Sequence, residues 1–162
     1  HWCDVKESWN PAIHPPTDID SIADNAAKYS QTIVITGGEP LMWDMNPLTQ
    51  MLKSKGVDTH IETSGAYPLS GTWDWICLSP KKMKLPTPEV YKAAHELKVI
   101  IFNKDDFRFA EEQAAKVSED CKLYLQPEWS KRDKMIPQIV DYVMQHPKWV
   151  VSLQTHKYLN IP

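Results

Sequence analysis

Six short runs of apolar and β-branched residues alternate with stretches of helical periodicity, and this alternation constrains the fold more than any other feature. The runs lie at residues 32–36, 59–62, 75–78, 97–102, 123–126 and 149–153. We interpret them as strands that are apolar throughout, as expected for a parallel sheet covered by helices. The sequence therefore predicts an α/β sheet or partial barrel.

Four stretches around these runs have apolar residues at helical spacing. They lie at residues 19–26, 48–52, 107–117 and 136–143. Thr17 and Asp20 are placed as a capping pair at the start of the first stretch. Residues 63–74 contain Gly65, Pro68 and Gly71, so we expect a loop there instead of a crossover helix.

Length and charge favour one globular domain over residues 1–162 that binds neither nucleic acid nor a membrane. The 18 basic and 21 acidic residues give a net charge of 18 − 21 = −3, without long blocks of one sign. No apolar stretch is long enough to span a bilayer, so we expect a cytoplasmic protein. The chain opens with His1, and we expect that it is truncated at this end.

Polar residues follow five of the six predicted strands. Because parallel strands end at one edge of a sheet, where α/β proteins bind ligands, these residues are expected to face one site. They are Thr36–Glu39, Glu62–Gly65, Ser79–Lys82, Gln126–Trp129 and Gln154–Lys157.

Each of these groups has an ordinary interpretation beside a functional one. Gly37 and Gly38 can expose backbone to a ligand, with Glu39 accepting from an ammonium group, or they can form a simple turn. Thr63 and Ser64, which follow Glu62, have hydroxyl groups that can bind sugar or carboxylate oxygens or can cap an ordinary turn. Lys81 can bind a carboxylate or belong to a solvated basic face.

The cysteines and His156 are also ambiguous when they are considered alone. Histidines such as His156 are more often surface or capping residues than catalytic ones. Cys77 and Cys121 are expected to be inert core thiols, and three widely spaced cysteines give no disulfide framework. Cys3 is either a buried thiol or a ligand of a metal or cluster.

Taken together, these motifs resemble the radical S-adenosylmethionine (SAM) superfamily, and most closely its 7-carboxy-7-deazaguanine synthase family. HWCD at residues 1–4 is similar to the end of a CxxC cluster loop, and ITGGEP at 35–40 to the methionine-binding strand. IETSG, LSPK, LQPE and the terminal QTHKYLNIP resemble the synthase family in the same order. The resemblance spans essentially the whole chain.

The resemblance implies a partial (β/α) TIM-type barrel that lacks its N-terminal strand and part of the cluster loop. It also implies a [4Fe–4S] cluster that binds SAM and generates a 5′-deoxyadenosyl radical. This radical would take hydrogen from 6-carboxy-5,6,7,8-tetrahydropterin, and ring contraction with loss of ammonia would give 7-carboxy-7-deazaguanine for queuosine-type deazapurines. The cofactors carry out the radical chemistry, and the protein directs the radical at the substrate and excludes water.

The resemblance also assigns residues to these ligands. Cys3 would bind the cluster. The cofactor residues would be Trp2, Asp4, Gly37, Gly38, Glu39, Ser79, Pro80, Lys81, Gln126, Pro127, Glu128 and Trp129. Thr36, Glu62, His156 and Pro162 would bind the pterin, with Glu62 and His156 as catalytic residues.

Two departures from the family pattern bear on the metals. The two other cluster cysteines would precede His1, so this chain as written cannot hold the cluster. Val5 stands where the family has a hydroxyl ligand of Mg²⁺, so either Ser8 or water replaces that ligand or the enzyme does not need Mg²⁺.

The resemblance further implies a homodimer and a reducing partner such as flavodoxin or ferredoxin. Two other functions stay open at this point. One is a radical SAM activase that makes a glycyl radical on a partner protein. The other is a cluster-free module that binds SAM or a nucleotide.

Overall fold

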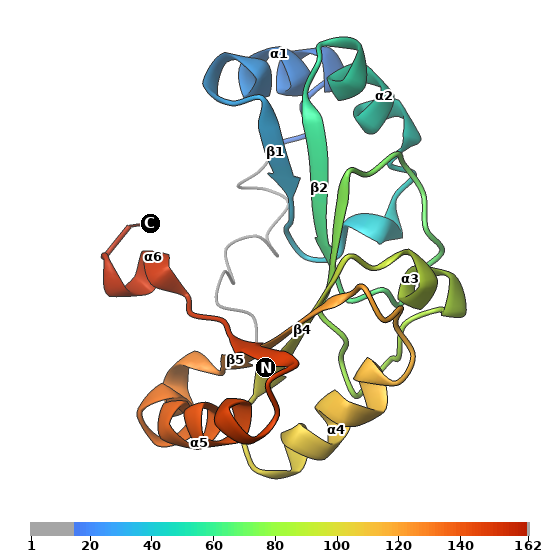
Figure 1. Ribbon diagram of the computed structural model, residues 1–162. Helices are drawn as coiled ribbons and strands as arrows, with labels where there is room; N and C mark the ends of the chain where they lie inside the picture. The colour runs from blue at the N-terminus through green and yellow to red at the C-terminus, as the bar shows by residue number, and fades with distance from the viewer. Residues whose placement is uncertain (1–14, 162) are drawn as a thin grey trace.

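The computed structural model describes residues 15–161, and six strands in this range form one parallel sheet (Figure 1). Their order in the sheet is their order along the chain. The strands are β1 (Thr32–Ile35), β2 (Asp58–Thr63), β3 (Trp75–Leu78), β4 (Glu96–Ile101), β5 (Lys122–Pro127) and β6 (Trp149–Val151). The predicted α/β class is confirmed, and the open sheet is consistent with a partial barrel.

Helices connect most of the strands, and each of the four predicted helical stretches overlaps a helix, although the helix in the third stretch ends at Ala114 and not at residue 117. The α-helices are α1 (Ile19–Tyr29), α2 (Asn46–Ser54), α3 (Pro88–Ala93), α4 (Asp105–Ala114), α5 (Arg132–Gln145) and α6 (Thr155–Tyr158). Two 3₁₀ turns, η2 (Pro40–Met42) and η3 (Trp129–Lys131), follow β1 and β5. The segment between β2 and β3 contains no helix, as predicted.

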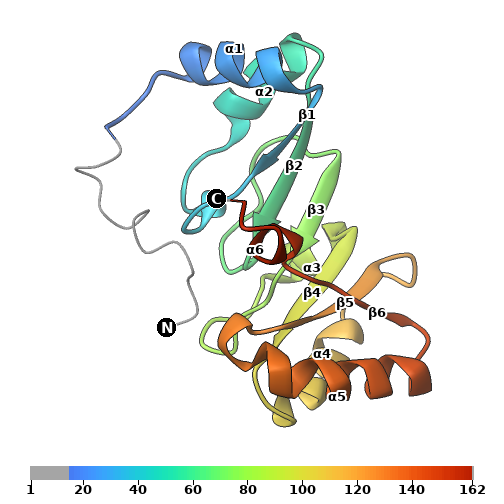
Figure 2. The same ribbon diagram turned by 90° about the vertical axis from the view of Figure 1, so that its left-hand side faces the viewer.

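The predicted cover of helices is present on one face of the sheet, where α1 to α5 lie. A right-handed connection between neighbouring parallel strands places its helix on the same face each time. Consecutive strand order therefore leaves the other face without helices of the repeating unit. Figure 2 looks onto this open face, with α6 in front of the strands.

The side chains of β2 and β4 follow this division. Ile61, Leu78, Leu97 and Leu125 are fully buried against the helices. Their neighbours on the same strands point to the open face, so burial alternates along β2 and β4. Along β2 and β4 every second residue is buried, which is the pattern of a sheet with one packed face, whereas β3 is buried at Ile76, Cys77 and Leu78 in succession.

The first helix has a different cap from the predicted pair of Thr17 and Asp20. Asp18 is the N-cap residue, and its carboxylate accepts a hydrogen bond from the amide of Ser21 at 2.8 Å. Asp18 has extended backbone angles, whereas Asp20 already lies inside the helix. The carboxylate at position 18 is therefore the one that can reach the free amides of the first turn.

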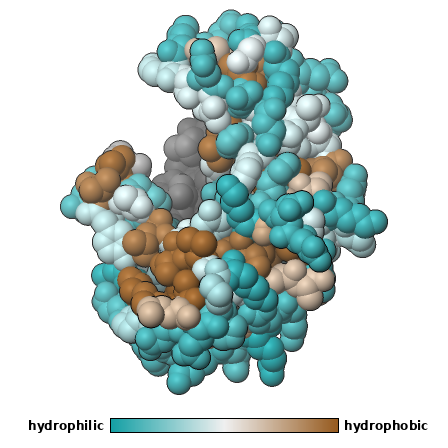
Figure 3. All heavy atoms as spheres, in the orientation of Figure 1, coloured by the Kyte–Doolittle hydropathy of each residue, from teal (hydrophilic) through white to brown (hydrophobic). Residues whose placement is uncertain are grey.

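The surface contains both hydrophilic and hydrophobic areas. Hydrophobic side chains gather over β6 and the adjoining part of α5 (Figure 3). They include Val140, Val150 and Leu153, which are 41%, 50% and 49% exposed. None of the helices between residues 15 and 161 has the length and apolarity that a membrane span needs.

Candidate active site

The ends of β1, β2 and β3 form a pocket of about 390 Å³. Seven residues that the sequence assigned to ligand binding line it: Thr36, Gly37, Gly38, Glu39, Glu62, Ser79 and Lys81. They come together because parallel strands bring their carboxyl ends to one edge of the sheet. The structure thus confirms that these residues converge, while their individual roles stay predictions.

At the Gly37–Gly38 turn, the backbone N–H and C=O groups are accessible from the pocket. Gly37 has a φ of 110°, which residues with a side chain rarely adopt. A Cβ atom built on Gly38 would meet no atom within 4 Å. The space beside Gly38 is therefore open to a ligand.

Glu39 holds this turn against the end of β2. Its Oε1 accepts hydrogen bonds from the Thr63 hydroxyl and from the amide of Leu41, at 3.2 Å for the latter. Its Oε2 accepts from both the amide, at 2.8 Å, and the hydroxyl of Ser64. Because a carboxylate has about four acceptor positions, protein groups occupy all of them. Glu39 therefore has a structural role, because its hydrogen bonds connect the turn after β1 to the end of β2.

Lys81 supplies a positive charge at the end of β3. Its ammonium group donates to the carbonyl oxygen of Ser79 at 2.9 Å and to the Ser79 hydroxyl at 2.8 Å. The residue is exposed overall, but this group turns back toward the strand end. Desolvation, followed by the charge of Lys98, lowers the pKa of Lys81 below its ordinary value. A nearby anion would offset both effects, because an opposite charge favours the ammonium form.

Glu62 faces the pocket from β2 and forms an ion pair with Lys98 of β4. The Lys98 ammonium donates to Oε1 of Glu62 at 2.6 Å. The Lys98 side chain is only 13% exposed, whereas that of Glu62 is 43% exposed. Glu62 therefore has one oxygen held by the protein and a carboxylate that a ligand can still reach.

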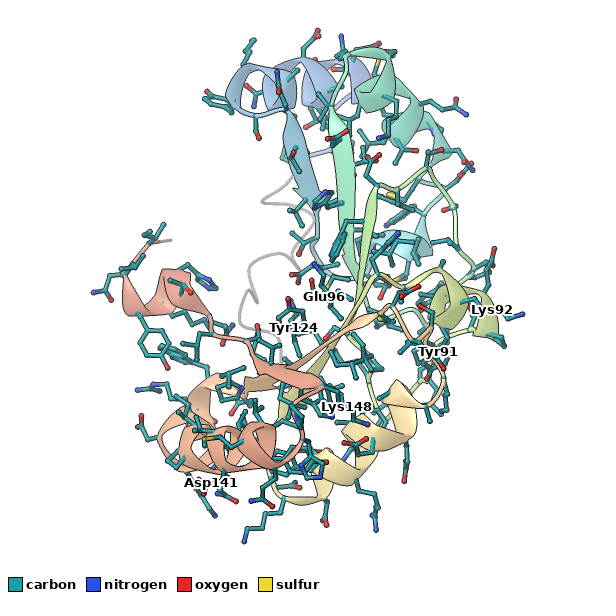
Figure 4. All side chains as sticks on the ribbon, in the orientation of Figure 1. Tyr91, Lys92, Glu96, Tyr124, Asp141 and Lys148 are labelled. Atoms are coloured by element: carbon teal, nitrogen blue, oxygen red, sulfur yellow. The ribbon has the colours of Figure 1, made fainter. Side chains whose placement is uncertain are left out.

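Further polar groups continue along the open face toward the start of the strands. Glu96 accepts from the indole of Trp75 at 3.1 Å and from the thiol of Cys77 at 3.4 Å. Figure 4 shows Glu96 and Tyr124 on this open side, while Tyr91 and Lys92 lie on the helix-covered side. The open face of the sheet thus has polar groups next to the pocket.

The residues predicted at the end of β5 form a second group beside the C-terminal segment. Trp129 packs edge-on against Tyr158 at 5.2 Å between ring centroids, and Arg132 lies 4.3 Å from the Trp129 ring. Gln126 accepts from the Ser152 hydroxyl at 3.2 Å. Pro127 is buried in the sheet, and Glu128 accepts from the Ser130 hydroxyl. None of these four predicted residues lines the pocket at the ends of β1 to β3.

His156 lies in α6 and is exposed. It does not line that pocket either, so the structure does not bring it together with Glu62. Pro80 lies beside the pocket at the end of β3 and lines a smaller, more apolar cavity of about 250 Å³ with Lys81 and Met83. Trp2, Cys3, Asp4 and Pro162 lie outside the described residues.

The described residues fit SAM better than they fit a cluster. Open glycine backbone, hydroxyl groups and the Lys81 cation match the amino-acid end and ribose of SAM. Residues 15–161 contain no group of three His, Cys, Asp or Glu side chains that could hold a metal. Cys77 and Cys121 are buried, and desolvation raises the pKa of both thiols, that of Cys121 to about 11. Such thiols are poor ligands.

Comparisons with known proteins agree on one family. A 7-carboxy-7-deazaguanine synthase of Flavobacterium psychrophilum is 70% identical over 162 residues, which cover this whole chain and 77% of that protein. The synthase of Synechocystis is 48% identical over 161 residues, which cover 99% of this chain and 77% of that protein. The chain belongs to the 7-carboxy-7-deazaguanine synthase family. No family model matches it.

A solved structure gives the same result for the fold. The crystal structure of QueE from Escherichia coli superimposes with a TM-score of 0.78 at 25% identity, over 94% of this chain and 78% of that chain. The synthase family suggested by the sequence motifs is thereby confirmed.

Sequence reasoning missed Lys98 as the partner of Glu62, and it missed that Thr63 and Ser64 bind Glu39. Thr63 and Ser64 were interpreted only as hydroxyls for a ligand or a turn, whereas both donate to Glu39. Lys98 was visible as the one charged residue inside the run LKVIIF. A lysine at this place in an apolar strand indicates a charged partner nearby.

Proposed function

We propose that this chain converts 6-carboxy-5,6,7,8-tetrahydropterin into 7-carboxy-7-deazaguanine. The observation that carries the proposal is the 70% identity, over the whole chain, to a 7-carboxy-7-deazaguanine synthase. Ammonia is the second product and accounts for the whole difference in composition between the two compounds. The overall reaction is therefore redox-neutral and consumes no oxidant.

The family implies a [4Fe–4S] cluster and SAM, which when bound supply the one-electron chemistry that removes hydrogen from the substrate. Cys3 would contribute one cluster ligand, and no described residue would contribute another. The Gly37–Gly38 backbone, Ser79 and Lys81 would hold the amino-acid end and the ribose of SAM. Gln126, Pro127, Glu128 and Trp129 would flank its adenosyl end, and Mg²⁺ is part of the same family expectation.

In the proposed reaction, the residues of this chain orient the pterin and exclude water from it. The Glu62 carboxylate would accept hydrogen bonds from N–H groups of the pterin ring through the oxygen that Lys98 does not hold. Thr36 would contact the same ligand from β1. His156, and the carboxylate of Pro162 if that residue ends the protein, would approach from the C-terminal segment, which requires α6 to move toward the pocket. A fixed carboxylate suits the paired N–H donors of such a ring.

Partners follow from the same family membership. A small-molecule substrate fits the pocket of about 390 Å³. Reduction would come from a protein such as flavodoxin or ferredoxin. A homodimer is supported by the exposed apolar side chains at β6, because edge strands with such residues tend to be covered. The glycyl-radical activase and the cluster-free binding module have no such support from the comparisons.

The test is an anaerobic assay of the full-length protein after cluster reconstitution, with SAM, a reductant and the carboxytetrahydropterin. We expect 7-carboxy-7-deazaguanine and ammonia in equal amounts, measured by mass spectrometry and an ammonia assay. Glu62→Gln should lose most of the turnover, whereas Lys104→Ala, at the same edge of the sheet but outside the pocket, should keep it. Failure of the unaltered enzyme to form the product would reject the proposal.

A further inference from the structure

Lys98 is the most buried lysine among the ion pairs of residues 15–161. Its side chain is 13% exposed, while the other paired lysines range from 29% to 52%. Burying an ammonium group is costly even when it has a partner, and a buried ion pair is often no more stable than apolar residues of similar volume. Stability alone is therefore a weak reason for a lysine at this position.

The partner of Lys98 faces the pocket. Lys98 on β4 reaches across β3 to Oε1 of Glu62 on β2, at 2.6 Å. Within residues 15–161, no other hydrogen bond to the Glu62 carboxylate is found. Lys98 itself does not line the pocket, whereas Glu62 does. One end of the pair is thus accessible to ligand and the other end is enclosed.

The charges around Lys98 keep its ammonium form. Burial by itself lowers the pKa of Lys98, but Cys77, the hydrogen bond and charge of Glu62, and the charge of Glu96 together raise it above the ordinary value. The group remains a cation and a donor throughout the neutral range. Glu62 therefore meets a permanent hydrogen-bond donor on one side.

We propose that Lys98 is a positioning residue, which holds one oxygen of Glu62 and thereby aims the other at the N–H groups of the pterin. This inference rests on the proposed function, because it concerns the substrate of that same pocket. A glutamate has three rotatable bonds, and an exposed one samples several rotamers. Fixing it before the substrate binds removes that entropy cost from the binding step.

Lys122 provides a matched control. It lies on the same open face, in register with Glu96, but its ammonium group is 5.0 Å from the centre of the Trp75 ring and makes no contact with Glu62. Replacing either lysine by methionine keeps an unbranched side chain and removes one positive charge. Only Lys98→Met removes the donor to Glu62.

The test is a double-mutant cycle on Lys98→Met and Glu62→Gln in the reconstituted full-length enzyme. Lys98→Met should raise KM for the carboxytetrahydropterin about tenfold and change kcat less than about threefold, because it weakens one charge-assisted hydrogen bond to the substrate. In the Glu62→Gln background the same substitution should change KM less than about twofold. Lys122→Met should leave KM unchanged.

Two further measurements separate this role from a structural one. Calorimetry without SAM should show the same tenfold loss of pterin affinity in Lys98→Met, and thermal unfolding should show a melting temperature close to that of the unaltered protein. Additive effects of the two substitutions, or an unchanged KM in Lys98→Met, would overturn the role of Lys98 while leaving the synthase reaction intact. An unaltered enzyme that forms no product would overturn the proposed function and this inference together.

Discussion

The two faces of the sheet use the same strands for different purposes. On the covered face, Leu78, Leu97 and Leu125 are fully buried against the helices. On the open face, the alternate positions of β2 and β4 hold Glu62, Glu96 and Lys98, each with a polar partner. One strand therefore contributes to stability through every second residue and to the pocket through the others.

This division teaches that effects of substitution should be separable within a single strand. Removing apolar atoms from the covered face costs transfer energy and leaves a cavity. Removing a polar group from the open face alters what the pocket can bind. Substitutions on the two faces of one strand therefore test this separation.

Leu97→Ala should destabilise the protein by about 2–5 kcal/mol, because Leu97 is fully buried in the covered core and its truncation leaves a cavity. Chemical denaturation monitored by circular dichroism measures this change. The matched variant is Lys98→Met, one residue further along the same strand. If Lys98→Met destabilised the protein as much as Leu97→Ala, the two faces of β4 would not be separable.

Gly65→Ala should cost roughly 2–4 kcal/mol, from a left-handed backbone and from overpacking. Gly65 has a φ of 72°, and a Cβ atom there would lie 2.6 Å from Cδ1 of Leu78 in the covered core. Gly37 also has a positive φ but meets no atom within 4 Å. Gly37→Ala should therefore cost only the backbone strain, and equal losses in both variants would contradict the packing argument.

The sequence predicts the strands closely, because β-branched and apolar runs mark where they begin. It does not predict α3 and α6, which are too short, at 6 and 4 residues, to show helical periodicity. Only the Thr87 cap and Pro88 at the first turn give a local signal for α3. The one-sided cover also escapes prediction, since it follows from strand order in the sheet.

The pocket is predictable to the extent that it depends on topology. The ends of β1, β2 and β3 had to meet once the strands were parallel, and Thr36, Gly38 and Lys81 do meet there. The pairing of Glu62 with Lys98 depends instead on a side chain that crosses an intervening strand. Such a contact leaves no spacing pattern in the sequence. The interactions of Glu39 with Thr63 and Ser64 are hidden for the same reason.

Lys81→Ala should weaken SAM binding about tenfold, since it removes the cation at the pocket while leaving the core untouched. Equilibrium dialysis with labelled SAM measures the affinity, and thermal unfolding checks the fold. Lys104→Ala removes the same charge from the same edge of the sheet, outside the pocket, and should bind SAM normally. Equal losses in the two variants would indicate a general electrostatic effect.

The smallest expected effect concerns pH and lies on the covered side, at Glu111 of α4. Desolvation raises the pKa of Glu111, but hydrogen bonds from Lys148, Tyr142 and Trp149 outweigh it and lower the pKa. A carboxylate with a lowered pKa stabilises the folded state above its unfolded pKa of about 4.3. This contribution is lost as the pH falls through the lower pKa of the folded protein.

Glu111→Gln should therefore be less stable than the unaltered protein at pH 7, and the difference should shrink as the pH drops below about 4.3. Urea denaturation at several pH values measures it. Arg108→Gln, in the same helix, changes only an exposed pair with Glu112 and should give a small offset at every pH. A gap between Glu111→Gln and the unaltered protein that stayed constant down to pH values well below 4 would mean that the Glu111 carboxylate is not preferentially ionised in the folded state.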